Sequence, residues 1–367
     1  MPNLLLITGA AGFVGRYAVE FALKESQYDF ILATDLRAPD YQIRIVGQKK
    51  FAFIKADLTK PEDVAKIRDR LRAFPDCKIT VWHIGGCFNY SASRELLYRV
   101  NVLGTKALLE MLLSLGIEFF KSSDETLTSR IQRFVFWSGG VVYGDFNHPD
   151  GVLPANENYP VNPQNDYGWS KKEAEDWVLH FHKTFGLSVT IMRLAAIYGP
   201  NSRYGMGSAL VLNARGHLAP IIAGNRHNKT ALVHVEDVIR VASFLSRVPE
   251  ADGEVYNVVD YTAYSLKTIS GFIGEKLNNK PFSGFSLPAW VFKFLIKLII
   301  LRAKQLGGKP IIDPELGNMV LLNSHMSNQK LRKLAQNYYL DDSLFQFPDS
   351  LIGLEKTIEW YGKEGWL

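Results

Sequence analysis

The sequence predicts an α/β fold built on a doubly wound parallel sheet, followed by a smaller mixed C-terminal lobe. Short apolar runs alternate with amphipathic stretches over residues 1–200, and a glycine-rich turn directly follows the first apolar run. Such alternation is typical of parallel sheets whose two faces are both covered by helices. With 47% hydrophobic and 22% charged residues, this chain of 367 residues has the composition of a globular protein large enough for two lobes.

Six apolar runs are predicted to be buried parallel strands, because strands of this kind are apolar on both faces. They lie at residues 3–8, 30–35, 51–57, 79–85, 132–138 and 187–199. Amphipathic stretches separate them, among them a long predicted helix at 94–116. After Pro200 the alternation loosens. We therefore assign residues 1–200 to one domain, with a return to its sheet at 230–260, and residues 201–367 to the C-terminal lobe.

Charge and cysteine content exclude several classes of protein. The formal net charge of +5 is small for this length and no long basic run occurs, so we expect no nucleic-acid partner. Cys77 and Cys87 are the only cysteines, too few for a disulfide framework or a cysteine metal site. The N-terminal residues lack the basic region and cleavage site of a signal peptide. We expect a cytoplasmic protein without a bound metal.

The glycine-rich turn indicates a phosphate-bearing cofactor. Gly9, Gly12 and Gly15 follow the first strand and precede a helix, with Phe13 and Val14 between the last two glycines. Glycines at this spacing let the chain turn sharply and let a pyrophosphate approach the backbone. The helix N-terminus then offers unpaired N–H groups and the positive end of its dipole to the anion. The turn is therefore predicted to belong to a Rossmann domain.

An aspartate at the end of the second strand refines the choice of cofactor. Asp35 lies twenty residues after Gly15. A carboxylate there accepts hydrogen bonds from ribose hydroxyls and repels a 2′-phosphate, which favours NAD. Arg37 could pair with that phosphate, so NADP stays the alternative.

A tyrosine and a lysine mark a candidate catalytic pair in the stretch "NDYGWSKKEAE". Tyr167 precedes Lys171 by four residues, so on a helix both side chains lie on one face. The lysine ammonium would favour the phenolate and lower the pKa of the tyrosine below its free value of about 10. A phenol of this kind can act as an acid or a base near neutral pH.

Together with the glycine turn, this pair makes the chain resemble the extended short-chain dehydrogenase/reductase family over nearly its full length. Further short motifs agree with that family in order: "KADLTK", "VNVLGT", "VYG", "YGP", "HVEDV" and "GEVYNV". The resemblance implies hydride transfer, with Tyr167 as acid or base and Lys171 on the nicotinamide ribose. It implies that Asn101 supports the active-site helix and that the adenine lies against Asp57 and Leu58.

Three departures from the family pattern stand out. Gly139 occupies the usual position of the catalytic Ser or Thr, and Ser138 lies one residue earlier, on the opposite face of a regular strand. The substrate oxygen could then be held by Ser138, by a backbone N–H or by water. The family's His-x-Ala-Ala is His83-Ile84-Gly85-Gly86, with His83 and Gly85 placed beside the cofactor and extra room at the glycines. Leu194 replaces a proline.

The substrate prediction depends on one position and on the C-terminal region. Nucleotide-sugar epimerases and dehydratases of the family usually carry a phosphate-binding arginine where this chain has Thr230. This difference and the tail "SLPAWVFKFLIKLIILRAK" resemble the 3β-hydroxysteroid and sterol dehydrogenase branch. The resemblance therefore implies an apolar substrate, sterol-like or lipidic, with a 3-hydroxy or 3-keto group. The alternatives are a nucleotide-sugar epimerase or dehydratase, and a catalytically silent NAD-binding regulator.

Residues 290–301 are apolar except for two lysines. Lys293 and Lys297 share one face, which leaves an apolar surface opposite that includes Phe292, Leu295, Ile296 and Ile299. That surface could pack in the C-terminal lobe, form a wall for an apolar substrate, or contact a membrane peripherally. The family resemblance also implies a homodimer through the helices that carry Asn101 and Tyr167.

Overall fold

A computed structural model describes residues 1–39, 50–89, 92–120, 130–202, 221–225, 227–278, 285–305, 321–339 and 343–366. Its centre is a seven-stranded sheet in the order β11-β6-β5-β4-β1-β2-β3, and every neighbouring pair is parallel. The strands are β1 (Asn3–Thr8), β2 (Phe30–Asp35), β3 (Phe51–Lys55), β4 (Lys78–His83), β5 (Ile131–Gly139), β6 (Val189–Leu194) and β11 (Glu254–Val258). The strand order reverses between β1 and β4, where parallel sheets of this kind bind ligands.

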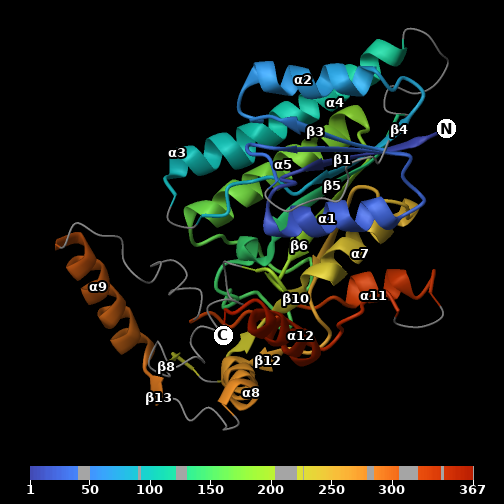
Figure 1. Ribbon diagram of the computed structural model, residues 1–367. Coiled ribbons are helices and arrows are strands. Elements are labelled where there is room, and N and C mark those ends of the chain that lie inside the picture. Colours follow the sequence, from blue (N-terminus) through green and yellow to red (C-terminus); the bar gives the residue numbers. More distant parts are fainter. Residues whose placement is uncertain are drawn as a thin grey trace.

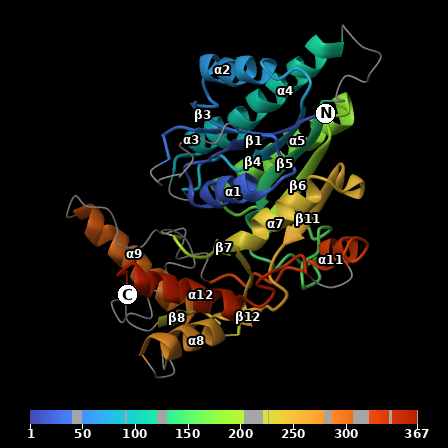
Figure 2. The ribbon, with the colours of Figure 1, turned by 45° about the vertical axis from the view of Figure 1, so that its right-hand side comes forward.

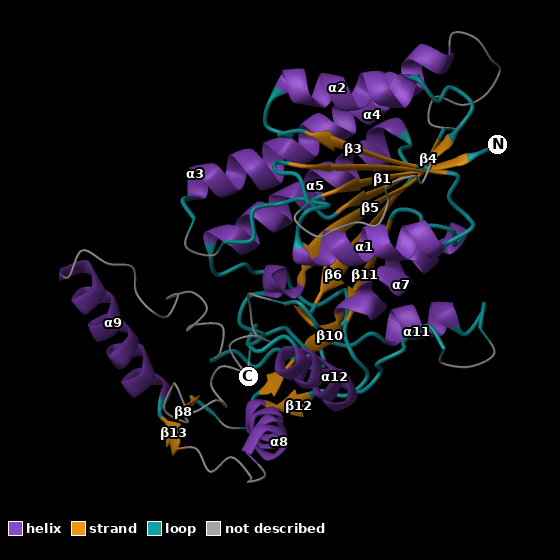
Figure 3. Cartoon of the chain, in the orientation of Figure 1, coloured by secondary structure: helices purple, strands orange, loops and turns teal. Residues whose placement is uncertain are grey.

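Helices cover both faces of this sheet (Figures 1 and 3). One face carries α1 (Phe13–Lys24) and α7 (Val235–Leu245), and the other carries α2 (Pro61–Arg72), α4 (Gly104–Phe120) and α5 (Asp166–Phe185). Each face has its own apolar core. Figure 2 brings α1 and α7 forward, side by side along the sheet. The predicted doubly wound fold is therefore confirmed.

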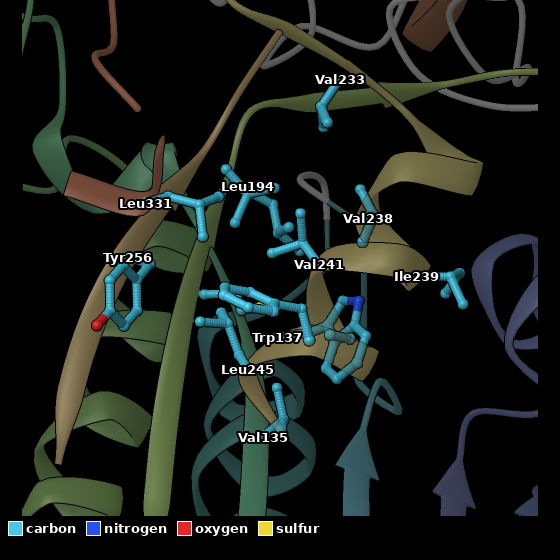
Figure 4. Packing of buried hydrophobic residues seen from close by; sticks show 14 of the residues in the cluster. Val135, Trp137, Leu194, Val233, Val238, Ile239, Val241, Leu245, Tyr256 and Leu331 are labelled. Carbon is cyan, nitrogen blue, oxygen red and sulfur yellow. The ribbon is translucent and has the colours of Figure 1, made fainter. Parts of the chain in front are cut away.

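Alternation along β5 assigns neighbouring side chains to opposite cores. Val135 and Trp137 pack with Val241 and Leu245 of α7 (Figure 4). Phe136 lies in the core beneath α4 and α5. Ser138 follows this alternation and faces α5, where it meets Glu175. This alternation determines which side of the sheet each residue near the end of β5 can reach.

The predicted helix at 94–116 is one helical segment interrupted by a π turn. It consists of α3 (Arg94–Leu97), a π-helical turn (Tyr98–Leu103) and α4. Apolar periodicity predicted the helix, but it could not reveal the wider turn, because one inserted residue hardly changes the pattern. Such turns are frequent at functional sites, and this one contains Asn101.

The predicted strand at 187–199 is wrong as a single strand, because it is two. β6 ends at Leu194, and β7 (Ala196–Tyr198) leaves the large sheet to pair with β10 (Leu232–His234). β6 is fully buried and β7 is at least partly buried, so an apolar run cannot show where the chain changes partner. The return expected at 230–260 consists of α7 on one face and β11 at the sheet edge.

Short elements form the rest of the C-terminal part. Its strand pairs are β9 (Lys229–Thr230) with β12 (Tyr264–Ser265), and β8 (Ile221–Ala223) with β13 (Phe285–Leu287). Its helices are α8 (Leu266–Asn278), α9 (Ala289–Gln305), α11 (Gln329–Ala335) and α12 (Ser350–Lys363). A third apolar core lies between α8 and α12 and includes Tyr198 and Leu232. The lobe thus packs on the segments that leave the sheet after β6.

Candidate active site

The glycine turn lies against the loop that follows β4, at the switch in strand order. A Cβ on Gly9, whose φ is +71°, would lie 2.7 Å from the Cα of Gly85, and a Cβ on Gly15 would lie 2.0 Å from the carbonyl oxygen of Gly9. Only glycine fits at these two positions. Gly12 caps α1, whose first turn holds no acidic residue. The helix N-terminus is therefore an open cradle of backbone N–H groups that suits a pyrophosphate.

The acidic residues predicted to bind the adenosine half lie at the ends of β2 and β3. The Asp35 carboxylate is half-buried and accepts hydrogen bonds from the N–H of Ala11 (2.9 Å) and of Arg37 (3.3 Å). It is thereby fixed beside the glycine turn. The Asp57 carboxylate accepts from the backbone and hydroxyl of Thr59. Leu58 packs beside Gly104 at the start of α4.

Tyr167 and Lys171 lie on the first turns of α5, which Asn165 caps by accepting from the N–H of Gly168 (2.8 Å). Both side chains are buried, at 8% and 6% exposure. Lys171 Nζ donates to the carbonyl oxygen of Trp137 over 2.8 Å. Burial lowers the pKa of Lys171 to about 8, although Glu175 opposes the shift. The lysine is therefore still largely charged at neutral pH, one turn from the tyrosine.

Asn101 joins this helix to the loop after β4. Its Oδ1 accepts from the N–H of Cys87 (2.7 Å), and its Nδ2 donates to the carbonyl oxygen of Cys87 (3.2 Å) and to Ser170 Oγ (2.9 Å). Ser170 in turn donates to the carbonyl oxygen of Tyr167. A Cβ on Gly86 would lie 3.0 Å from Asn101 Oδ1 and 3.5 Å from Lys171 Nζ. The extra room expected at Gly86 is therefore taken up by these two side chains.

His83 is fully buried and both ring nitrogens are hydrogen-bonded. Nδ1 lies 2.7 Å from Thr8 Oγ1, and Nε2 lies 2.9 Å from Thr105 Oγ1. Thr105 donates its hydroxyl proton to the carbonyl oxygen of Asn101, so it accepts from His83 Nε2–H. Thr8 accepts from the N–H of Gly85 and donates to Nδ1. Burial, with a smaller contribution from Lys171, lowers the pKa of His83 to about 3, which agrees with this neutral ring.

His83 was predicted to lie beside the cofactor. Its ring lies between β1 and α4, where it links the residue before the glycine turn to the π turn of Asn101, so contact with the cofactor stays a prediction. Gly85, by contrast, lies directly against Gly9. The chain of hydrogen bonds therefore runs from the cofactor cradle to the helix of Tyr167.

Ser138, predicted as a substitute for the missing serine, has a different partner. Its hydroxyl donates to Glu175 Oε1 over 2.5 Å, and Glu175 is paired with Arg193 at 2.8 Å. Arg193 also donates to Tyr143 Oη, which donates to Asn257 Oδ1. This buried network joins the family motifs "VYG" and "GEVYNV" across the sheet. The hydroxyl of Ser138 thus belongs to the network beneath the site.

Gly139 has room for a side chain. Its φ of −150° is ordinary extended backbone, and a Cβ would meet nothing closer than 3.6 Å. Backbone strain therefore does not explain why this chain has glycine where the family has serine or threonine. Neither a turn nor a close approach requires glycine at this position.

Sequence reasoning missed Thr8, Thr105, Ser170 and Glu175. Two of them carried a usable signal, because Ser170 and Glu175 lie within the helix of the Tyr167/Lys171 pair, and Glu175 is one turn after Lys171. The two threonines gave none, since their link through His83 arises only when β1, β4 and α4 come together. Among the residues that the structure describes, no group of His, Cys, Asp or Glu is arranged to hold a metal ion.

This fold and site define an NAD-dependent enzyme of the extended short-chain type, and comparison with known proteins agrees. The NAD dependent epimerase/dehydratase family matches residues 5–258, and the chain belongs to this family. Membership confirms NAD as the predicted cofactor. The structure also resembles that of UDP-glucose 4-epimerase from Thermus thermophilus in complex with NAD, with a TM-score of 0.67, 20% identity, and 98% and 99% of the two chains covered.

Two relatives bear on the substrate prediction. A putative UDP-glucose 4-epimerase of Methanocaldococcus jannaschii is 29% identical over 342 residues, which cover 89% of this chain and all of that protein. A 3beta-hydroxysteroid-dehydrogenase/decarboxylase (isoform 1) of Arabidopsis thaliana is 23% identical over 348 residues, covering 89% of this chain and 74% of that protein. The steroid enzyme is the more distant of the two. The similarity therefore favours the alternative of a nucleotide-sugar epimerase or dehydratase over a sterol dehydrogenase.

Proposed function

We propose that this protein is a nucleotide-sugar epimerase or dehydratase. The observation that carries the proposal is the pairing of Tyr167 and Lys171, both buried on adjacent turns of α5, with a glycine cradle at the switch point of the sheet. Similarity to sugar epimerases over the whole length of a relative supports the substrate class. The glycine cradle and Asp35 would hold NAD, which would supply a reversible hydride acceptor for a substrate carbon.

The protein's own residues supply the proton transfer. Tyr167 takes the proton of a substrate hydroxyl, and in an epimerase it gives this proton back to the carbonyl oxygen. The ammonium of Lys171 stabilises the phenolate, and its buried position makes that attraction stronger than it would be in water. Asn101 and Ser170 hold the helix so that the tyrosine stays in place.

A second candidate is oxidation or reduction of an apolar 3-hydroxy or 3-keto substrate. Thr230 favours it, because this residue occupies the position of the usual phosphate-binding arginine and is itself buried in β9, paired with Tyr264 of β12. A nucleotide diphosphate would then need cations from elsewhere in the chain.

A substrate panel distinguishes the two candidates. The enzyme is incubated with NAD and UDP-glucose, UDP-N-acetylglucosamine or dTDP-glucose, and products are identified by NMR. We expect a changed sugar without net formation of NADH, since the hydride returns to the product. Net NADH formation from a 3-hydroxysteroid or a 3-hydroxy fatty acid, with no sugar turnover, would favour the second candidate. Tyr167→Phe should lose the conversion of the sugar, because it cannot exchange the proton. Its matched control is Tyr338→Phe, at an exposed tyrosine that donates a hydrogen bond to Glu250.

A further inference from the structure

Helix α9 exposes a continuous apolar stripe to solvent. Trp290, Phe294, Leu298 and Leu301 are 73%, 57%, 45% and 54% exposed. Their spacing of four, four and three residues places them on one face of the helix. In Figure 1, α9 stands apart from the sheet and from α8 and α12, and no other described helix packs along it.

This stripe is not the face that the sequence indicated. Ile296 is buried at 6% exposure and Phe292 is partly buried, whereas Leu295 and Ile299 are exposed, so the face predicted opposite the lysines is covered only in part. Lys293 and Lys297 instead flank the exposed stripe. With Trp290 and Phe294 they line an open hollow of about 420 Å³ on its surface.

The charges of α9 indicate what covers the stripe. The helix contains no acidic residue. The cationic residues Lys293, Lys297 and Arg302 are exposed and flank the stripe. A second copy of α9 would bring like charges together, which disfavours a symmetrical contact between two such helices. An anionic lipid surface would interact favourably with all three features of the helix, namely its apolar side chains, the flanking cations and the tryptophan at one end.

We propose that α9 docks the protein on an anionic membrane surface, lying in the plane of the interface with Trp290, Phe294, Leu298 and Leu301 inserted among the lipids. A helix of this length is about 25 Å long. Within the described part of the chain, no helix is long and apolar enough to cross a membrane. α9 therefore attaches to one leaflet, and Lys293 and Lys297 meet the lipid phosphates.

Sedimentation with vesicles tests this proposal on the full-length protein without substrate, so the result does not depend on the reaction catalysed. We expect wild-type protein to bind phosphatidylcholine vesicles that contain phosphatidylglycerol. Phe294→Asp with Leu298→Asp should weaken binding at least about tenfold, because two inserted side chains become charged. The matched control, Val152→Asp with Ile352→Asp, changes two exposed apolar residues outside α9 and should bind like wild type.

A second variant tests the electrostatic contribution to vesicle binding separately from the insertion of apolar side chains. Lys293→Gln with Lys297→Gln should lose about tenfold on the anionic vesicles and show little change on pure phosphatidylcholine. The proposal is overturned if wild type does not bind anionic vesicles, or if the stripe variant binds like its control. It is also overturned if the stripe variant fails to fold, or if its only change is loss of a dimer, since the stripe would then be a protein contact.

Discussion

Asn101 Nδ2 donates a hydrogen bond to Ser170 Oγ over 2.9 Å, and this contact joins the π turn before α4 to the first turns of α5. Ser170 Oγ in turn donates a hydrogen bond to the carbonyl oxygen of Tyr167. One amide and one hydroxyl thus connect the helix of Tyr167 to the loop after β4, beside the ring contact between Phe88 and Tyr167.

Replacing this hydroxyl should reduce turnover more than cofactor binding. We expect Ser170→Ala to lower kcat by about tenfold to a hundredfold, because small displacements of a catalytic group are costly, while NAD affinity changes little. Ser170→Thr, which keeps the hydroxyl, should recover much of the activity. Ser114→Ala on α4 removes a similar local hydrogen bond away from the site and serves as control. Equal losses in kcat and NAD affinity would mean that the contact is merely structural.

Tyr167→Phe and Lys171→Ala should differ in a diagnostic way. The phenylalanine variant keeps the ring but cannot exchange a proton, so kcat should fall by about 10²–10⁴-fold with NAD affinity preserved. The alanine variant should lose both, because the lysine is expected to bind the nicotinamide ribose. Steady-state kinetics and NAD titration measure the two effects. Near-normal turnover by Tyr167→Phe would refute the assignment of this site.

Gly139→Ser should fold normally, because its Cβ has space and its backbone is extended. We expect it to raise kcat by supplying the hydroxyl that the family usually has at this position.

Ser138→Ala should cost about 1.5–3 kcal/mol of stability, since the Ser138 hydroxyl donates a hydrogen bond to a buried carboxylate. Unchanged kinetics of Ser138→Ala would remove Ser138 from the mechanism, whereas a large loss of kcat at normal stability would support its catalytic role.

Asp35 should give a preference for NAD over NADP of about tenfold or more, because its carboxylate repels a 2′-phosphate. Asp35→Asn removes the charge and should abolish most of this preference. Titration of both cofactors measures it. Equal or tighter binding of NADP by the wild-type protein would contradict the prediction and point to Arg37.

His83 should make the protein sensitive to acid. Its pKa is about 3 in the folded protein and about 6.5 when unfolded, so the unfolded chain takes up a proton first and stability falls as pH drops below about 6.5. Between pH 8 and 5 this single group contributes a loss of about 2 kcal/mol. The free energy of unfolding of His83→Gln, measured with denaturant, should therefore fall by about that much less than that of the wild type over this pH interval. His180→Gln, on the exposed side of α5, controls for removal of a histidine; parallel curves for wild type and His83→Gln would contradict the prediction.

The sequence was informative where one local pattern has one physical meaning. Apolar runs of strand length predicted the strands of the sheet up to β6, and the glycine turn predicted the cofactor cradle. Predictions were wrong where one local pattern is compatible with two structures. The run at 187–199 is largely buried although its chain changes sheets, and the lysines of 290–301 border the exposed stripe instead of opposing it.

By itself, the sequence determined the class of fold, the placement of Tyr167 and Lys171 on one helix, and the NAD cofactor, because each depends on spacing along a single strand, turn or helix. The tertiary structure alone decided that His83 is a neutral link between Thr8 and Thr105, and that Ser138 belongs to Glu175. It also decided which side of α9 meets solvent. These properties depend on which elements pack together, and residues far apart in the chain carry no local pattern that encodes their contact.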